Sequence, residues 1–435
     1  MSENYYHSVT LDEALCKGCT VCIKGCPTEA IRVQKGRARI TADRCIDCGE
    51  CIRTCPSGAK KAVSDPLALL ENFDYTVAIP APTLYGQFSS DISCNRILTA
   101  LKGIGFDDVF EVALSAEILS RETRNYLKER KGNAPLISSS CPVIVRLVET
   151  RFPSLIDQLV PMISPMELSA RIVREKLKDS RGRVGVFFIS PCAAKVTDIR
   201  TPRGIETSSV DGVIGIKDIY RELSQAIGRV ETEEPLSRAH AMGISWARTD
   251  GEGSAVFSEN HISVDGIEHV IDVLESLENG HIENVDFVEM MSCPGGCVGG
   301  PLTVENPYIA RNIITCRERR HLPDEPVSLP EEALLDSGVL SIRWTESVES
   351  RTTHLLDPDY RKAMQMMEDM EAIRQGLPGL DCGSCGAPSC RALAEDIVRG
   401  RTTETDCVFM LRERIRELTR EMIDLESRMP PGLDR

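Results

Sequence analysis

The feature that most constrains this fold is an internal repeat of cysteines near the start of the chain. Its two copies, CKGCTVCIKGCP and CIDCGECIRTCP, both follow the pattern C-x2-C-x2-C-x3-C-P. The chain has 18 cysteines among 435 residues, which is too sparse for a small disulfide scaffold, while their spacing is too regular for chance. We therefore expect metal ligation in a reducing compartment, and a cytoplasmic protein.

This spacing is similar to that of bacterial two-cluster ferredoxins, in which the fourth cysteine of each run binds the other cluster. The resemblance implies that residues 1–68 form a ferredoxin-like domain with two 4Fe-4S clusters. A zinc ribbon is the alternative, but its paired C-x2-C knuckles need neither a third cysteine nor a proline in each run. The two implied ligand sets are Cys16, Cys19, Cys22 and Cys55, and Cys45, Cys48, Cys51 and Cys26.

From about residue 74, apolar segments that are typical of strands alternate with helical patterns. These segments, YTVAIPAP, VFEVAL, APLISSS, RVGVFFIS and VDFVEMMS, predict an α/β domain over residues 69–350. Ligand sites in α/β sheets collect beyond the carboxyl ends of strands, so cysteines that directly follow strands are expected to converge. The double glycine between the last two of them is expected to let the loop approach a bulky ligand. The four cysteines are Cys141, Cys192, Cys293 and Cys297.

One more set of four cysteines lies in residues 351–410, with the spacing C-x2-C-x4-C-x16-C, and predicts a small helical 4Fe-4S domain. Its members are Cys382, Cys385, Cys390 and Cys407. Residues 411–435 are expected to form a helix and tail, in which apolar residues alternate steps of four and three. This seam predicts association with its own copy or a partner helix through residues 408–429, or packing on its own domain. The seam consists of Leu411, Ile415, Leu418, Met422, Leu425 and Met429.

Charge and hydropathy exclude several classes of partner. A formal net charge of -15 argues against nucleic-acid binding, because contacts to phosphates require clustered Lys and Arg. No stretch of about 18 apolar residues occurs without charge, so no membrane span is expected. The N-terminus lacks a basic segment followed by an apolar run, and export is not expected either.

Three of the cysteine loops resemble the signature loops of the FeFe-hydrogenase catalytic domain. They are SSSCPVIVRL, SPCAAKVTD and MMSCPGGCVGG, and the resemblance extends from about residue 77 to about residue 306. It implies a multidomain chain that combines α+β and α/β parts, and four 4Fe-4S clusters. One of these clusters would be held by the four central cysteines. Cys297 would bridge it to a two-iron subcluster that carries CO, cyanide and azadithiolate.

The resemblance also assigns roles to other residues. Lys195 would donate to a cyanide ligand, and Met291 would lie next to the two-iron subcluster. Ser140 stands where active members have the thiol that passes protons, and a hydroxyl is a poorer acid because its pKa is far higher. Val160 replaces a relay serine, whereas Glu122 lies in the region that supplies a relay glutamate. These departures resemble the sensory branches of the family.

We therefore expect slow, reversible oxidation of H2 and reduction of protons, in a sensory or regulatory role. The expected partners are H2, protons and a redox protein such as ferredoxin or another oxidoreductase subunit. One alternative is an electron-transfer subunit of a larger complex that lacks the two-iron subcluster. The other is an interaction protein whose output is the C-terminal helix. Retention of the four central cysteines and Lys195 argues against a simple electron carrier, while the altered relay argues against a fast enzyme.

Overall fold

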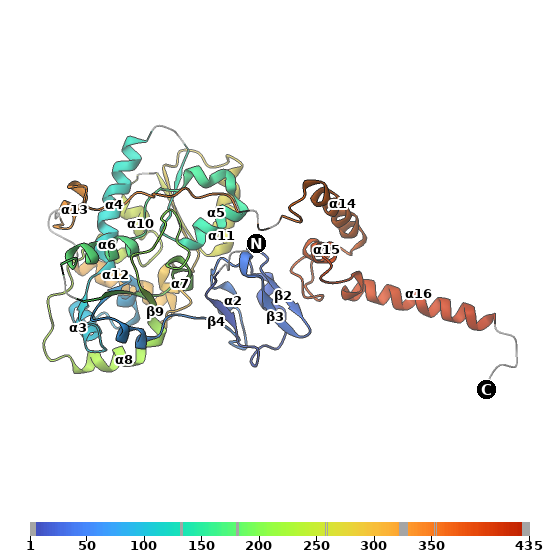
Figure 1. Cartoon of the computed structure of the whole chain (residues 1–435), viewed down its shortest axis with the longest axis horizontal. Helices are drawn as coiled ribbons and strands as arrows, with labels where there is room; N and C mark the ends of the chain where they lie inside the picture. The colour runs from blue at the N-terminus through green and yellow to red at the C-terminus, as the bar shows by residue number, and fades with distance from the viewer. Residues whose placement is uncertain are drawn as a thin grey trace. The chain divides into compact units, whose positions relative to one another are not determined.

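The structure is a computed structural model of the whole chain (Figure 1). It describes residues 6–130, 134–179, 182–256, 258, 260–321, 329–351, 353 and 355–428. The chain forms two compact units, and the cysteine repeat is divided between them. The first unit comprises Met1–Thr10, Cys45–Arg53 and Lys61–Arg351, and the second comprises Leu11–Arg44, Thr54–Lys60 and Thr352–Arg435.

A four-stranded parallel sheet with the order β6-β5-β8-β9 lies in the first unit. Strand β5 pairs with β8 from Tyr75 opposite Val184 to Pro80 opposite Ile189. Beyond their first residues, both strands are buried throughout, as expected of a parallel sheet that is covered on both faces. The strands are β5 (Tyr75–Pro80), β6 (Asp108–Val109), β8 (Val184–Ser190) and β9 (Gly212–Gly215).

A second parallel sheet of the same unit has the order β10-β11-β7. Its strands are β7 (Leu136–Ile137), β10 (His261–Asp265) and β11 (Phe287–Met291). All five residues of β11 are buried, including the charged residue Glu289. The cysteine loops follow β7 and β11 in this sheet and β8 in the other. The cysteine site is therefore built from the carboxyl ends of strands in two different sheets.

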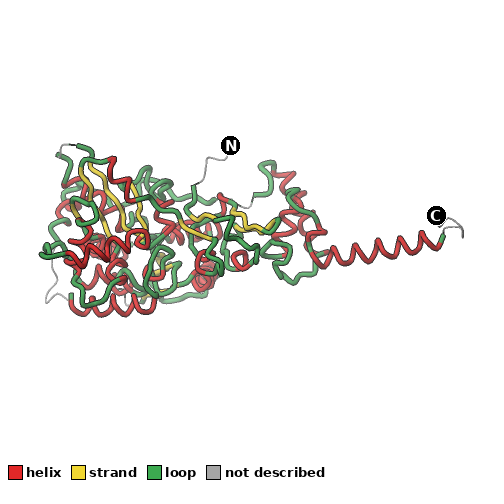
Figure 2. The backbone as a smooth tube through the Cα atoms, turned by 90° about the horizontal axis from the view of Figure 1, so that it is seen from below, coloured by secondary structure: helices red, strands yellow, loops and turns green. Residues whose placement is uncertain are grey.

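Helices pack around the strands of the first unit (Figure 2). Leu114 and Ile118 of α4 and Leu168 of α6 share one apolar core with Ile79 and Val186 of the first sheet. These helices therefore bury their apolar faces on the strands that lead to the cysteine loops. The helices are α2 (Glu50–Arg53), α3 (Cys94–Lys102), α4 (Val112–Glu129), α5 (Pro142–Arg151), α6 (Pro165–Lys176), α7 (Ala193–Asp198), α8 (Ile216–Arg229), α9 (Ala241–Ser245), α10 (Gly251–Val256), α11 (Ile267–Glu278), α12 (Pro307–Arg320) and α13 (Glu332–Asp336).

The strand predicted from VFEVAL is much shorter than expected. Strand β6 ends at Val109, and α4 begins at Val112. The last three residues of that segment, Val112 to Leu114, are instead buried as the first turn of a helix. A short apolar run fits a buried helix turn as well as a strand, so periodicity alone did not separate the two.

The second unit contains the start of the cysteine repeat and the C-terminal cysteine set. Strands β2 (Ile31–Gln34) and β3 (Arg37–Ile40) form an antiparallel hairpin. Met370, Leu377, Leu393 and Cys407 are buried together in the C-terminal part. The helices are α1 (Val21–Lys24), α14 (Tyr360–Gly376), α15 (Cys390–Val398) and α16 (Val408–Ser427). Strands β1 (Val9–Leu11) and β4 (Lys60–Ala62), most of whose residues belong to the first unit, form a separate two-stranded sheet.

Helix α16 carries the predicted heptad seam, and none of its residues from Val408 to Ser427 is buried. The five seam residues within it are between 42 and 61% exposed. The last seam residue, Met429, and the rest of the expected tail lie outside the described residues. None of the helices in the described part of the chain is long and apolar enough to cross a membrane.

Candidate metal centre

The ends of three strands bring four thiols together in the first unit. Cys141 lies between β7 and α5, Cys192 lies between β8 and α7, and Cys293 follows β11. Cys297 begins the next short turn. Burial and the thiolate charges of the other three cysteines raise the pKa of the Cys297 thiol well above its usual range. The Ser292 hydroxyl lies 3.9 Å from the Cys141 sulfur and 3.8 Å from the Cys293 sulfur. The four sulfurs are therefore neighbours.

Four convergent thiols are the donor set of a 4Fe-4S cluster. Burial also raises the pKa of the thiols of Cys192 and Cys293, so the metal-free chain favours their protonated forms. A bound metal displaces the thiol protons, and its positive charge offsets the mutual repulsion of the thiolates. The chemistry and burial of these residues thus fit a cubane.

The glycines of the PGGCVGG turn are required by backbone packing. Gly295 and Gly296 have φ values of +75° and +96°, which residues with a Cβ rarely adopt. A Cβ on Gly296 would lie 2.6 Å from the backbone nitrogen of Thr249. We expected these glycines to make room for a ligand, but at Gly296 a neighbouring backbone segment occupies that space.

An apolar cavity of about 100 Å³ opens beside the thiols. Lys195 faces it and is only 8% exposed, and its ammonium lies 3.2 Å from the Asp198 carboxylate. A buried cation at an apolar cavity favours an anionic ligand, because both charges lack water there. The structure brings the predicted residues to this cavity, whose lining includes Ser140, Cys141, Cys192, Lys195, Met291 and Cys297.

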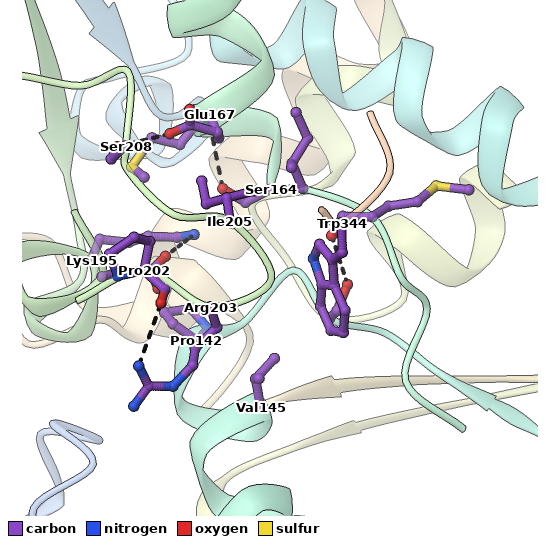
Figure 3. Close-up of a pocket in the computed structure, with 15 residues that line it drawn as sticks. Pro142, Val145, Ser164, Glu167, Lys195, Pro202, Arg203, Ile205, Ser208 and Trp344 are labelled. Atoms are coloured by element: carbon purple, nitrogen blue, oxygen red, sulfur yellow. Dashed lines mark hydrogen bonds and ion pairs between the residues drawn. The ribbon is translucent and has the colours of Figure 1, made fainter. Parts of the chain in front are cut away.

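A second, smaller cavity of about 30 Å³ also has Lys195 in its lining (Figure 3). The figure places Glu167, Arg203 and Trp344 around it. The Glu167 carboxylate accepts hydrogen bonds from the Ser208 hydroxyl at 2.8 Å and from a backbone amide at 2.9 Å. These donors satisfy the carboxylate within the protein. This cavity has room for water but does not need a charged ligand.

A pair of buried carboxyl groups lies behind Ser140. Glu252 of α10 accepts hydrogen bonds from the Ser138 hydroxyl at 2.6 Å and from the Ser140 hydroxyl at 3.2 Å. Burial and the negative charge of Glu289 raise the pKa of Glu252 to about 8. Burial likewise raises the pKa of Glu289 to about 7. Both carboxyl groups can therefore gain or lose a proton near neutral pH.

Further polar groups connect this pair to the surface. Glu289 of β11 accepts a hydrogen bond from the Ser263 hydroxyl at 3.0 Å, and the same hydroxyl lies 3.2 Å from the Asp250 carboxylate. Asp250 in turn lies 2.7 Å from the His261 ring, and its side chain is 44% exposed. Hydrogen bonds thus join Ser140 at the cavity to Glu252, and Glu289 through Ser263 to Asp250 and the partly exposed His261, while the two carboxyl groups are coupled through their charges.

The comparison with known families decides the class of this protein. The family model described as the C-terminal domain of the iron-only hydrogenase large subunit matches residues 74–259 and 247–301, which together cover more than half of the chain. The protein belongs to the iron-only hydrogenase family. A 4Fe-4S dicluster domain matches residues 8–56, and an Fe-S cluster domain matches residues 377–409. The expected hydrogenase-like and iron-sulfur domains are confirmed at this level.

Several known hydrogenases are similar to the chain. The NADP-reducing hydrogenase subunit HndD of Solidesulfovibrio fructosivorans is 24% identical over 59% of this chain and 55% of its own length. The periplasmic [Fe] hydrogenase large subunit of Nitratidesulfovibrio vulgaris is 27% identical over 58% of this chain and 63% of its own length. The chain thus spans between about half and two thirds of these relatives. A solved structure of [FeFe]-hydrogenase HydA1 from Chlamydomonas reinhardtii covers 63% of this chain and 91% of its own, with 15% identity and a TM-score of 0.47.

The relay residues expected from the family do not lie at the cavity. Glu122 is on the outer part of α4, where it bonds the Asn125 side chain at 3.3 Å, and Val160 is buried in the main apolar core. Neither residue lines the two cavities described above. Glu252 and Glu289 were not predicted from the sequence. The signal for Glu289 was present, because a glutamate in the middle of an otherwise apolar buried strand is unusual.

The second copy of the cysteine repeat contacts the central thiols within the first unit. The Arg53 guanidinium donates to the backbone oxygen of Cys48 at 3.0 Å and to the Cys293 sulfur at 3.7 Å. Cys45, Cys48 and Cys51 belong to this unit. Arg53 therefore places one positive charge between two predicted cluster sites.

The second unit gathers two further groups of cysteines. Burial raises the pKa of the Cys22 thiol, and the charges of Cys19 and Cys55 act in the same direction. The Cys16 sulfur accepts a hydrogen bond from the Ala38 amide at 3.4 Å. The C-terminal set is similarly close, because burial and the charges of its neighbours Cys407 and Cys382 raise the pKa of Cys385. Cys390 packs against the same buried core. Cys26 also lies in this unit.

Proposed function

We propose that this protein interconverts H2 with protons and electrons at the central cavity, slowly and in a sensory or regulatory role. The observation that carries the proposal is an apolar cavity whose lining combines three of the four convergent thiols with Lys195 and Ser140. A simple electron carrier needs the thiols, but it does not need a buried lysine that faces a cavity. A fast hydrogenase needs a better proton donor than a serine hydroxyl.

Cys141, Cys192, Cys293 and Cys297 would hold the cubane, and Cys297 would also bridge to the two-iron subcluster. When bound, that subcluster supplies the site at which H2 is split or formed. The Lys195 ammonium would donate to an anionic ligand of the subcluster, with Asp198 orienting it at 3.2 Å. The Met291 side chain would pack beside it and limit access of water.

Proton movement is assigned to the polar chain behind Ser140. A proton taken up at Asp250 or His261 would pass through Ser263 to Glu289 and on to Glu252. From Glu252 it would reach the cavity through the Ser140 hydroxyl, which lies 3.2 Å away. The two carboxyl groups suit this role because their raised pKa values lie near neutral pH. The Ser140 hydroxyl is a far weaker acid than the thiol that active members have at this position, and it is proposed to make the route slow.

Electrons would move through the three remaining cysteine sets, each holding one 4Fe-4S cluster. The proposed external partner is a redox protein such as a ferredoxin or another oxidoreductase subunit. Helix α16 is proposed to join its own copy or a partner helix, because its apolar seam is exposed along its length and most of the stability of a helix in a protein comes from packing of its apolar face.

Infrared spectroscopy after assembly with a synthetic two-iron precursor tests the proposal. Bound CO and cyanide absorb where the protein does not, and both sets of bands are expected from the wild-type chain. Cys297→Ala should remove the bands, whereas the matched variant Cys385→Ala, in the other unit, should retain them. The electron-transfer alternative, in which the chain never receives the two-iron subcluster, predicts no such bands even in the wild type. That result would refute the proposal.

A further inference from the structure

The C-terminal cysteine domain is held to the segment between the two copies of the repeat by two buried ion pairs. Arg44, next to the hairpin, pairs with both carboxylate oxygens of Glu395 on α15. Arg32 of β2 pairs with Asp396, the next residue of α15. The side chains of the Arg44 pair are only 4 and 9% exposed. Removing one member of a buried pair leaves an uncompensated buried charge, so a substitution at either partner is expected to disrupt the docked arrangement.

Backbone contacts bring the two cysteine-bearing loops close together. The Val33 amide donates to the Gly386 carbonyl at 2.8 Å, and a Cβ on Gly386 would lie 1.8 Å from the Val33 carbonyl oxygen. The Lys24 ammonium donates to the backbone oxygen of Asp381, next to Cys382. Ile23, next to Cys22, lies 3.3 Å from where a Cβ on Gly383 would be. Residues adjacent to one cysteine set thus touch residues adjacent to the other.

We propose that the C-terminal cluster is the direct electron-transfer partner of the cluster held by Cys16, Cys19, Cys22 and Cys55, and that Arg44 and Glu395 hold the two at a fixed distance. One electron leaves the reduced C-terminal cluster and reduces the other cluster, or moves in reverse, and no proton or bond changes. An external redox protein supplies or removes that electron. The C-terminal domain is thereby the place at which electrons enter or leave the series of clusters, and not an output domain held only by a flexible linker.

Electron transfer between clusters slows steeply with distance, and the contacts described above hold residues next to the two cysteine sets against each other. A domain held only by a flexible linker would need no buried ion pairs. Nor would it need a glycine such as Gly386, whose side-chain space is filled by the backbone of β2. The inference requires both clusters but not the two-iron subcluster. It extends the proposed function and can be tested separately from it.

The test uses electron paramagnetic resonance of the full-length, dithionite-reduced chain without the two-iron subcluster. Spin interaction with the C-terminal cluster is expected to speed relaxation of the ferredoxin-type signals. Cys385→Ala, which removes that cluster, should slow this relaxation. Arg44→Glu should slow it as well while the iron content stays unchanged, because it places a negative charge opposite Glu395. The matched control Arg39→Glu makes the same charge change at an exposed position of β3 and should have no effect.

A double variant that exchanges the two charges of the Arg44–Glu395 pair shows whether slow relaxation comes from lost docking or from misfolding. Arg44→Glu combined with Glu395→Arg should restore fast relaxation in part, since Arg399 also contacts position 395 at 2.9 Å and will oppose the new arginine. Unchanged relaxation in Cys385→Ala, with one cluster less by iron analysis, would overturn the assignment of partners. Slow relaxation that persists in the double variant would overturn the role of the ion pair. Absent CO and cyanide bands, with the spin interaction present, would refute only the proposed H2 chemistry.

Discussion

Glu252→Gln is expected to make the protein more stable at neutral pH and less active. Glutamine imitates the neutral carboxyl group, because its amide oxygen can accept a hydrogen bond from one of the two serines and its NH2 group can donate to the other, but it cannot pass on a proton. Burial and the charge of Glu289 raise the pKa of Glu252 to about 8, from an ordinary value of 4.5. The same physical cause therefore governs both effects of this substitution.

The sign and size of the stability effect follow from this pKa. A raised pKa means that the folded chain binds the proton more tightly than the unfolded chain, so stability is lost as pH rises from about 4.5 to about 8. The full difference corresponds to about 5 kcal/mol at 1.36 kcal/mol per pKa unit, of which about 3 kcal/mol is lost by pH 7. For a domain of this size, about 3 kcal/mol corresponds to a shift in Tm of roughly 6 to 12 °C.

Calorimetry of the chain without the two-iron subcluster, at pH 5 and pH 7, measures this effect. The Tm of the central domain should fall with pH more steeply in the wild type than in Glu252→Gln. H2 oxidation with an artificial electron acceptor should fall by about 100-fold in the variant, within the range for a positioned acid or base. The matched control is Glu117→Gln, because Glu117 is also buried but pairs with His240 and lines neither cavity. If the Tm fell equally with pH in the wild type and in Glu252→Gln, the idea that Glu252 is buried as a neutral carboxyl group would be refuted. An unchanged rate of H2 oxidation would exclude Glu252 from the proton route.

Four other expectations follow from the site. Ser140→Cys should raise H2 oxidation by about 10- to 100-fold, because a thiol pKa lies nearer the working pH; an unchanged rate, with CO and cyanide bands intact, would place the bottleneck elsewhere. Arg53→Leu should shift the reduction potential of the central cubane to more negative values in a spectroscopic titration, since it removes the positive charge 3.7 Å from the Cys293 sulfur; an unshifted potential would contradict this electrostatic role. Iron analysis before maturation should find about sixteen irons per chain, four for each proposed cubane, and a count near eight would exclude two of them. Truncation after Cys407 should lower the mass in solution or release a bound partner, whereas an unchanged assembly would exclude α16 as the contact.

The sequence alone was sufficient to predict the donor chemistry. The spacing of the repeat and the loops after three apolar segments identified the cysteines and the family resemblance, because ligand type and local spacing are properties of short segments. The resemblance also placed Lys195 and Met291 at the site, and the structure finds both at the cavity. The apolar seam of α16 could also be predicted from the sequence, because it depends only on helical periodicity.

Tertiary structure decided which groups lie behind those cysteines. Glu252 and Glu289 are 37 residues apart in the sequence, and only the packing of α10 against β11 brings both behind Ser140. Their raised pKa values result from burial, which is a property of the folded environment and not of the residues themselves. Glu122, by contrast, matched the expected relay region but lies on the outer part of α4. Arg44 and Glu395 likewise lie 351 positions apart, and long-range pairing of this kind leaves no local pattern from which the sequence could have predicted it.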